Sequence, residues 1–531
     1  MSGKRVLALY AALLLGFAAV LCRLYWLALN PVYAARAAAQ STVILQLPAR
    51  RGNFYDHQGR LLTGLEERWQ ALCFPGGQNY ARLYAYTDEA GQALLYRSRN
   101  RAAPFLVEVV QDLSPLGVRC YPSARRYAAV PLCQHLLGYL DGEGHGAAGL
   151  EKALDDLLTG TGACSSIACA VTAQGTLRTG ETPQLTAADS GAVGVQLTLD
   201  RAVQRAAEAV AAQSMTSGCI LILDTATAAV RASVSVPGYD PQQLSASLQA
   251  ENSPFVNRVL ESYAVGSVFK PVLAAAALQA GVLPVYACTG AVVVDGQIFR
   301  CAGGVPHGEV DLAAALAKSC NGYFIRLGQQ LGAQAVLEMA QELGFGQQVE
   351  LAGSLEADAG QLSTAEELAQ SGQLANFSFG QGSLLASPVQ VAGMLNAIAA
   401  GGIFRTPAFV AGTLDEADGQ PLETLAHPRQ RQVLSAENAA QLRQMLVQVV
   451  EEGTGQEAAA VSGGAGGKTG TAQTGQFTPD GTERKNLWFA GFYPAAKPRY
   501  TIVVLQDGVV HPAASSAAVF AQLCTALDLL E

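Results

Sequence analysis

Three short motifs, far apart but in a fixed order, constrain this chain more than any other feature. Ser267-Val268-Phe269-Lys270 stands where the turn Tyr263-Ala264-Val265-Gly266 enters an apolar helical stretch. Ser319-Cys320-Asn321 follows about 50 residues later, and Lys468-Thr469-Gly470-Thr471 about 150 residues after that. Residues three apart share one face of a helix, so the Lys270 amine can reach the Ser267 hydroxyl. Because a serine needs a neighbouring base to become a good nucleophile, we predict a fold that brings the three motifs to one active site.

Each motif alone has an ordinary structural interpretation. Ser-x-x-Lys also describes an N-cap serine followed by a solvated lysine, and the other two motifs also read as turns. Gly467-Lys468-Thr469 further resembles a phosphate-binding loop, but that loop needs a glycine five residues earlier, where this chain has Ser462. The order and spacing of all three motifs together therefore carry the prediction of an active site.

Lys270 must be uncharged to act as the base. A free lysine has a pKa near 10.4, and lowering this pKa by about 3 units costs about 4 kcal/mol. Burial and the charge of Lys468 are the two effects that we expect to supply the shift. Ser319, at the start of a helical run, is placed to relay a proton towards a leaving amine. Asn321 has both an acceptor and donors, so it can hold Lys270 and a substrate amide.

The third motif has the groups that a carboxylate needs. Lys468 offers a charge and Thr469 a hydroxyl, while Gly470 is expected to let a substrate backbone approach closely. The backbone amides of Thr471 and Ser267 are expected to form a two-donor oxyanion hole. The predicted catalytic set is Ser267, Lys270, Ser319, Asn321, Lys468, Thr469, Gly470 and Thr471. Within it, Lys468, Thr469, Thr471 and Asn321 are also predicted to bind substrate.

The amino end contains an apolar segment long enough to cross a bilayer. Residues 6–22 are seventeen uncharged, mostly apolar residues, and the run resumes after Arg23 as far as Leu29. Lys4 and Arg5 precede it, so the positive-inside rule predicts a cytoplasmic amino end and an extracytoplasmic remainder. A cleaved signal peptide is the alternative, with Ala37-Ala38-Ala39 as a mimic of a cleavage site, but this site lies beyond the apolar run. We therefore expect a retained single-pass anchor in the cell membrane, at residues 6–29.

The remaining chain divides into two predicted domains. Residues 31–190 mix short strand-like runs with turns, whereas longer regular elements begin at Val195, after a Thr/Gly/Ala-rich passage. In residues 191–531, strands at both ends surround a helical middle, which indicates an α+β fold with an antiparallel sheet flanked by helices. The helical middle includes predicted helices over 201–213, capped by Asp200, and over 312–331. The predicted order is an anchor at 1–30, a mixed, non-catalytic domain at 31–190 and a catalytic domain at 191–531.

Charge and cysteine content exclude some functions and leave others open. A net charge of −9 without a basic stripe gives no sign of nucleic-acid binding. Eleven cysteines show no disulfide framework, although Cys288 could pair with Cys301 and Cys164 with Cys169. A zinc site is disfavoured because no Cys-x-x-Cys or His-x-x-x-His is present. We therefore predict no cofactor and no metal.

With these motifs the chain resembles class B penicillin-binding proteins, which are membrane-anchored peptidoglycan D,D-transpeptidases. The resemblance covers nearly the whole chain. It includes 51–59 and 149–151 of the expected pedestal domain, of the dimerisation type, and Thr198-Leu199-Asp200, Phe379-Gly380-Gln381-Gly382 and Ser387-Pro388 of the expected transpeptidase domain.

The resemblance implies a complete reaction. The donor is a peptidoglycan stem peptide ending in D-Ala-D-Ala, held by Lys468 and Thr469 while Ser267 forms an acyl-enzyme. A neighbouring stem amine then accepts the acyl group, in septal, elongation or spore wall synthesis, and β-lactams acylate Ser267 covalently. A polytopic membrane glycosyltransferase is the expected protein partner.

Two other functions use part of the same features. A β-lactamase shares the three motifs but needs a carboxylate-assisted water, and no Glu-x-x-Leu-Asn segment is present to supply it. A β-lactam sensor or a catalytically silent scaffold would bind without turnover, but a sensor is expected to carry several membrane spans. Loss of function in a Ser267→Ala chain would separate the enzyme from the scaffold.

Overall fold

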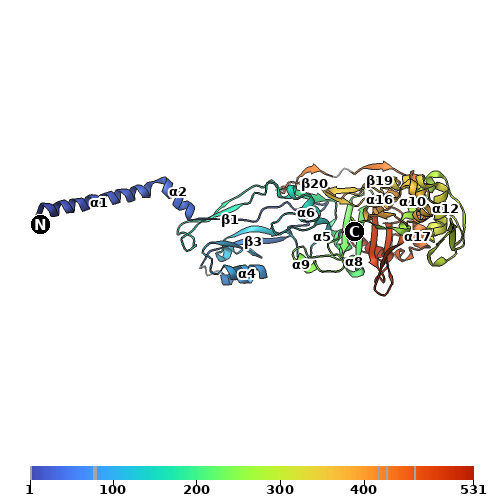
Figure 1. The fold of residues 1–531 in the computed structure, drawn as a ribbon, viewed down its shortest axis with the longest axis horizontal. Helices are drawn as coiled ribbons and strands as arrows, with labels where there is room; N and C mark the ends of the chain where they lie inside the picture. Colours follow the sequence, from blue (N-terminus) through green and yellow to red (C-terminus); the bar gives the residue numbers. More distant parts are fainter. Residues whose placement is uncertain (1–2, 76–79, 417, 426–427, 460–461, 531) are drawn as a thin grey trace. The chain divides into compact units, whose positions relative to one another are not determined.

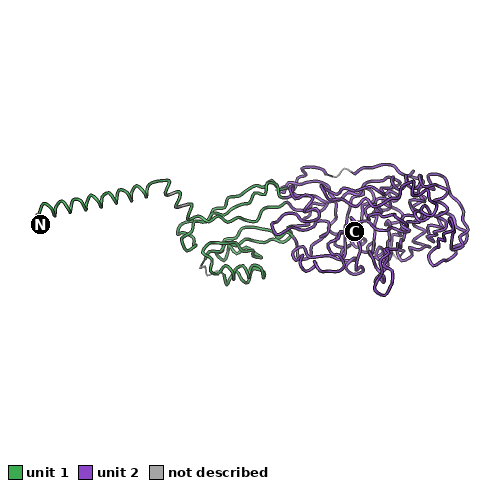
Figure 2. Tube along the Cα trace, in the orientation of Figure 1, with its two compact units in different colours: residues 1–51, 64–126, 159–192 green, residues 52–63, 127–158, 193–531 purple. Residues whose placement is uncertain are grey.

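The computed structural model describes residues 3–75, 80–416, 418–425, 428–459 and 462–530. The fold is α+β, as predicted, and its contacts divide the chain into two interleaved units (Figure 2). One comprises residues 1–51, 64–126 and 159–192, and the other 52–63, 127–158 and 193–531. The second unit thus contains two segments that the sequence analysis assigned to the amino-terminal domain. The predicted single boundary near residue 190 stays a prediction.

The first unit begins with α1 (Gly3–Leu29), which is long and apolar enough to span a membrane and buries none of its side chains (Figure 1). It is the one such helix among the residues that the structure describes. The unit also contains two antiparallel sheets, ordered β1-β6-β7 and β4-β3-β5. Its further elements are α2 (Pro31–Gln40), β1 (Thr42–Gln46), β3 (Glu66–Cys73), α3 (Tyr80–Leu83), α4 (Glu89–Ser98), β4 (Phe105–Val109), β5 (Cys120–Arg125), β6 (Ser166–Ala170) and β7 (Gln184–Thr186).

The second unit is built on a five-stranded antiparallel sheet in the order β10-β9-β25-β24-β23. Its strands are β9 (Gly218–Asp224), β10 (Val230–Val236), β23 (Gly466–Phe477), β24 (Glu483–Tyr493) and β25 (Tyr500–Val509). Both faces of the sheet are buried, because alternate residues of β9 and β25 enter two different cores. Leu221 and Val503 belong to the larger core, whereas Ile222 and Ile502 belong to the smaller one.

Helices cover each face of this sheet. On the face of the smaller core lie α8 (Arg201–Ser214) and α18 (Ser516–Asp528), which also pack on each other. On the other face lie the fully buried α16 (Pro388–Ala399), α10 (Lys270–Ala280) and α17 (Ala436–Glu451), as labelled in Figure 1. The predicted cap is confirmed, because the Asp200 carboxylate accepts from the amides of Ala202 and Val203 at the start of α8.

The remaining elements of this unit surround the sheet. A second sheet, β2-β8-β20-β21, joins residues from both ends of the sequence. The helices are α5 (Gln134–Leu137), α6 (Gly149–Ala153), α7 (Asp155–Thr159), α9 (Leu244–Ser247), α11 (Leu312–Ala317), α12 (Asn321–Leu331), α13 (Ala333–Glu342), α14 (Ala365–Leu368) and α15 (Ser371–Ser378). The strands are β2 (Phe54–Tyr55), β8 (Gly194–Leu197), β11 (Tyr263–Ala264), β12 (Tyr286–Cys288), β13 (Ala291–Val294), β14 (Gln297–Arg300), β15 (Gly308–Val310), β16 (Val349–Ala352), β17 (Leu355–Ala357), β18 (Leu385–Ala386), β19 (Ile403–Arg405), β20 (Val410–Leu414), β21 (Pro421–Thr424) and β22 (Gln430–Gln432).

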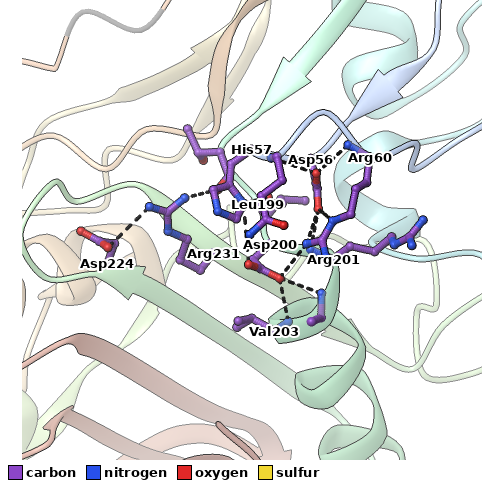
Figure 3. Close-up of polar contacts among 12 residues, drawn as sticks. Asp56, His57, Arg60, Leu199, Asp200, Arg201, Val203, Asp224 and Arg231 are labelled. Atoms are coloured by element: carbon purple, nitrogen blue, oxygen red, sulfur yellow. Dashed lines mark hydrogen bonds and ion pairs between the residues drawn. The ribbon is translucent and has the colours of Figure 1, made fainter. Parts of the chain in front are cut away.

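A buried carboxylate ties the 52–63 segment to the start of α8 (Figure 3). Asp56 is 0% exposed, and its Oδ2 accepts from Arg60 Nε at 2.7 Å and from the Arg201 amide at 3.2 Å. Arg60 also contacts Asp200 at 3.2 Å. Burial alone raises a carboxyl pKa, but the hydrogen bonds from Arg60 and from backbone amides outweigh it and lower the pKa of Asp56. This network joins Asp56 and Arg60 to the residues at the start of α8.

One predicted helix is wrong. The sequence predicted a single helix over 312–331, whereas the structure breaks it into α11 and α12 at Lys318–Cys320. Ser319 has a φ of 52°, in the left-handed region, and Cys320 is extended. A non-glycine residue adopts that conformation only when its surroundings stabilise it. The break turns the second motif into a corner between two helices.

Candidate active site

Ser267 lies on a short 3-10 turn, Gly266–Phe269, that runs directly into α10. Close backbone contacts hold the turn in place. The Gly266 amide donates to the Gly380 carbonyl at 2.9 Å, and the Trp488 indole donates to the Ala264 carbonyl at 3.0 Å. Gly266 has a φ of +59°, and a Cβ there would lie 2.5 Å from the Thr471 carbonyl oxygen. The turn therefore packs against β23 and requires glycine at 266.

Lys270 joins the first motif to the second. Its side chain is fully buried, and Nζ donates to the Ser319 carbonyl at 2.7 Å, to Ser319 Oγ at 3.1 Å and to Asn321 Oδ1 at 2.7 Å. Among the described residues, no hydrogen bond links Lys270 to Ser267, although the sequence predicted that contact. The resting amine is thus held by the corner between α11 and α12, one helical turn from the partly exposed Ser267.

Asn321 has its amide orientation fixed by a second contact. Its Nδ2 donates to the Arg300 carbonyl at 2.9 Å, so its Oδ1 is the end that faces Lys270. Arg300 lies at the end of β14, in a hairpin that the sequence did not connect with the site. Its carbonyl is a positioning group that sequence reasoning missed.

The third motif occupies β23, with Lys468 fully buried. Lys468 Nζ lies 3.3 Å from Thr469 Oγ1 and 3.4 Å from Thr454 Oγ1, and the two threonine hydroxyls are 2.7 Å apart. Thr454, in the turn after α17, was also missed by the sequence analysis. The Gly453-Thr454-Gly455 turn shortly before the third motif was the available signal. These groups present one amine and two hydroxyls together.

Gly470 has a different role from the one predicted. We expected glycine here to let a substrate approach, but the space beside its Cα is filled by the protein itself. A Cβ would lie 2.9 Å from the Val265 carbonyl oxygen, 2.9 Å from Val268 Cγ1 and 3.2 Å from Trp488 Cβ. Gly470 therefore permits β23 to pack against the turn that carries Ser267. The next residue, Thr471, is exposed and has its carbonyl beside Gly266.

Burial changes the protonation of both lysines. Burial lowers the pKa of Lys270 to about 7, so a large fraction of this amine is neutral near neutral pH. Burial, together with the charge of Lys270, lowers the pKa of Lys468 well below its ordinary value. Burial lowers the pKa of Lys270 as predicted, whereas the predicted effect of the Lys468 charge on Lys270 is not found; the charge effect between the two lysines lowers the pKa of Lys468 instead. A substrate anion beside Lys468 would favour its charged form.

The cysteines nearest the site do not form the disulfide that the sequence left open. Cys288 and Cys301 have their sulfurs 3.7 Å apart, and both are free thiols. Cys320, between Ser319 and Asn321, lies 3.9 Å from the Cys301 sulfur, and His307 Nδ1 lies 3.5 Å from the Cys288 sulfur. Cys164 and Cys169 are also free. The structure thus gathers four metal-binding side chains that the sequence analysis did not group.

The fold brings the three motifs together, and the comparisons with known proteins identify the class to which the fold belongs. A family model, the penicillin-binding protein transpeptidase domain, matches residues 218–525. The chain belongs to this family, in the class B penicillin-binding proteins.

Curated relatives and solved structures agree with this assignment. Stage V sporulation protein D of Bacillus subtilis is 30% identical over 402 residues, which cover 72% of this chain and 60% of that protein. The peptidoglycan D,D-transpeptidase PbpA of Mycolicibacterium smegmatis is 29% identical over 419 residues, or 74% of this chain and 79% of that one. Apo penicillin-binding protein 3 of Mycobacterium tuberculosis superposes with a TM-score of 0.66 and 25% identity, over 92% of this chain and 97% of that chain.

A further structure shows a related fold in an assembly. A chain in a peptidoglycan synthase complex that coordinates polymerization and crosslinking superposes with a TM-score of 0.71, at 24% identity. The superposition covers 99% of this chain and 98% of that one. The family and the transpeptidase fold that the motifs predicted are confirmed, and the predicted enzyme class agrees with the names of the PbpA relatives.

Proposed function

We propose that the chain is a peptidoglycan D,D-transpeptidase that works through an acyl-enzyme on Ser267. Ser267 Oγ attacks the carbonyl of the penultimate D-Ala of a donor stem peptide, and the bond to the terminal D-Ala nitrogen breaks. The Ser267 proton passes to Lys270 and leaves with that nitrogen. An amine on a neighbouring stem then attacks the acyl carbonyl, the bond to Ser267 Oγ breaks, and the proton that the amine loses returns to Ser267 Oγ. The observation that supports this most is the buried Lys270, which bonds both residues of the second motif one turn from Ser267.

The contacts of Lys270 suggest how the proton moves. A neutral amine keeps two N–H donors and one lone pair. The Ser319 carbonyl and Asn321 Oδ1 can only accept, so they take the two donors and leave the lone pair free for the Ser267 proton. The N–H formed by that transfer can donate to the Ser319 hydroxyl, which can then pass its own proton on. Ser319 thus completes a path from Lys270 towards the leaving nitrogen, which is the relay expected from its place in the motif. The eight predicted site residues keep their roles in this proposal, except that Gly470 acts through packing.

Lys468 and Thr469 would hold the terminal carboxylate of the donor. The hydroxyls of Thr469 and Thr454, close to the Lys468 amine, form one polar group at which an anion gains charge-assisted hydrogen bonds. The amides of Ser267 and Thr471 would stabilise the oxyanion, because Thr471 lies against the Gly266–Ser267 peptide. A β-lactam would acylate Ser267 in the same geometry.

The test is the site of covalent modification. The full-length chain in detergent is incubated with fluorescent penicillin, and the adduct is mapped by mass spectrometry. We expect one adduct, on Ser267, that disappears in Ser267→Ala and persists in Ser245→Ala, a control at an exposed serine of α9. Steady hydrolysis of a chromogenic cephalosporin, or an adduct on another residue, would contradict the proposal.

The setting of the enzyme is part of the same proposal. The α1 helix would anchor the chain in one pass, with Lys4 and Arg5 on the cytoplasmic side and the catalytic unit outside. Protection of the amino end and exposure of the catalytic unit to protease added outside intact cells would test this orientation. The similar chain solved in a peptidoglycan synthase complex supports a membrane glycosyltransferase as the partner. Co-purification with such a polymerase after crosslinking would test that partner.

A further inference from the structure

Four metal-binding side chains converge beside the second motif: Cys288, Cys301, His307 and Cys320. Their spacing in the sequence is Cys-x12-Cys-x5-His-x12-Cys. Cys288 ends β12, Cys301 follows β14, His307 precedes β15 and Cys320 caps α12. The three cysteines are buried, with exposures of 3%, 3% and 0%. All four ligand atoms lie within 4.8 Å of one another.

Three of the six distances between ligand atoms match the edges of a tetrahedron around a metal ion, and the other three are within 4.8 Å. A zinc ion bonds sulfur at about 2.3 Å and imidazole nitrogen at about 2.0–2.1 Å, so tetrahedral edges are about 3.8 Å between two sulfurs and about 3.6 Å between sulfur and nitrogen. The observed edges are 3.7 Å for Cys288–Cys301, 3.9 Å for Cys301–Cys320 and 3.5 Å for Cys288–His307. A disulfide would need about 2.05 Å between two of these sulfurs.

The donor set selects the ion. Three thiolates and one imidazole in tetrahedral array are typical of zinc, and four protein ligands leave no open position, as in structural sites. The surroundings suit the single negative charge that three thiolates leave on such a centre. The Gly290 amide points at the Cys288 sulfur at 3.4 Å, and Lys318 Nζ donates to the His307 carbonyl at 3.2 Å.

We propose that Cys288, Cys301, His307 and Cys320 bind one zinc ion in a closed structural site that holds the second motif in position. Two ligands adjoin groups that orient Lys270. Cys320 lies between Ser319 and Asn321, which both accept from Lys270 Nζ, and Cys301 follows Arg300, whose carbonyl holds the Asn321 amide. Through Cys320, a bound ion would therefore fix the backbone that carries Asn321. Through Cys301, it would fix the Arg300 carbonyl that accepts from the Asn321 side chain.

The local packing gives the ion a structural task. The β13–β14 hairpin has only a small core with α12 and α15, and Val293 and Ile298 on its outer side are 56% and 52% exposed. Such a small core stabilises a hairpin weakly. Zinc bound at Cys288 and Cys301, on either side of this hairpin, would fasten it to the start of α12. The positional role rests on the proposed transpeptidase function, whereas the zinc site itself does not.

The first experiment measures metal content, independently of activity. The full-length chain is purified in detergent with a reducing agent and without added metal, and its metals are counted by inductively coupled plasma mass spectrometry. We expect about one zinc per chain in the wild type and in Cys524→Ala, a control at a buried cysteine of α18 outside the cluster. Cys301→Ala and His307→Ala should lose at least about tenfold in zinc affinity. His307→Cys should keep the ion, with four sulfur ligands.

Several outcomes would overturn the zinc site. One is wild-type protein that holds less than one tenth of a zinc per chain after incubation with stoichiometric zinc. Another is wild-type protein that holds stoichiometric iron in place of zinc. The third is zinc binding by Cys301→Ala and His307→Ala that is as tight as in the wild type. Peptide mapping that finds Cys288–Cys301 oxidised to a disulfide in metal-free, penicillin-reactive protein would do the same. The metal count and the peptide mapping use the wild type, so they remain decisive even where a cysteine variant does not fold.

A second experiment tests the geometry and the positional role. Cobalt-substituted protein should show thiolate-to-cobalt charge transfer and the strong visible bands of a tetrahedral site. A weak octahedral spectrum would contradict the proposed ligands. Removal of zinc by a chelator should slow penicillin acylation about 10- to 100-fold, with recovery when zinc is restored. An unchanged acylation rate in demonstrably zinc-free protein would refute the positional role and leave the zinc count and the transpeptidase function standing.

Discussion

We expect Gly380→Ala to slow acylation strongly, although the substitution alters none of the reacting groups. Gly380 has a φ of +85°, and a Cβ built on it would lie 1.9 Å from the Gly266 carbonyl oxygen. Real Cβ contacts stay above about 3.0 Å, so this gap must open by about 1.1 Å. The neighbouring atom is backbone and cannot rotate away. The Gly266–Ser267 peptide is planar, so a shift of its oxygen also shifts the Ser267 amide, which is the proposed oxyanion donor.

The expected loss follows from that displacement. A misplacement of about 1 Å near a reaction centre costs about 10²-fold in rate, which corresponds to about 2.7 kcal/mol of activation free energy. The assay is the second-order rate constant for acylation of full-length protein by fluorescent penicillin, read from gels over time. Thermal unfolding of each variant, followed by circular dichroism, reports the accompanying loss of stability.

The same loop supplies a matched control. Gly382 also has a φ of +85°, but a Cβ there would meet only Asn376 Cβ at 3.5 Å, which is an ordinary contact. Gly382→Ala carries the same left-handed backbone strain of about 1–2 kcal/mol and should acylate within a few-fold of the wild type. Equal rates in the two variants, or a wild-type rate in Gly380→Ala, would refute the argument that the Gly266–Gly380 contact positions the nucleophile.

Three further predictions concern Lys270, Thr454 and Asp56. Acylation needs the neutral Lys270 amine, whose pKa burial lowers to about 7, so the rate should rise about tenfold per pH unit below pH 7 and level off above it; a rate still rising towards pH 10 would show an ordinary lysine pKa. Thr454→Val should weaken reversible penicillin binding about five- to tenfold by removing the hydroxyl beside Thr469, with recovery in Thr454→Ser and little change in the acylation step; equal binding by both variants would exclude this role. Asp56→Asn should lower the free energy of unfolding by about 1–3 kcal/mol in denaturant titrations, because the Arg60 side chain and the Arg201 backbone amide lose their charged acceptor, and acylation per folded molecule should stay unchanged.

The sequence predicted those parts of the fold that depend on local signals. The central strands β9 and β25 appear in the sequence as short apolar runs, and the Asp200 cap marks the start of α8 correctly. The break between α11 and α12 was not predictable, because residues 312–331 contain no helix-breaking proline, and both glycines, Gly322 and Gly328, lie inside α12 after the break. The left-handed Ser319 is stabilised by Lys270, which contacts both its carbonyl and its hydroxyl from another helix. A tertiary contact of this kind leaves no local pattern.

The active site likewise combines residues that short sequence motifs reveal with residues that only the fold brings together. Motif order identified the three motifs that converge, because their residue types already state the chemistry. It did not reveal Thr454 or the Arg300 carbonyl, which join the site through backbone geometry. The cysteine and histidine cluster was missed for a similar reason, since separations of five and twelve residues match no short metal-binding motif. For Gly470 we expected a substrate beside the Cα, because only the packed structure shows that Val265, Val268 and Trp488 fill that space.

The position of β25 between β9 and β24 has a consequence for biosynthesis. A ribosome adds about 5–20 residues per second, so the segment that forms β9 waits about 15–60 s before the last central strand exists. Until then, the buried apolar residues of β9 have no edge partner on that side, and the nucleophile turn lacks β23 and β24 as supports. On the proposed mechanism, the nascent chain therefore cannot react with a β-lactam until its final tenth has emerged. It is also exposed to aggregation for that interval unless a chaperone covers it.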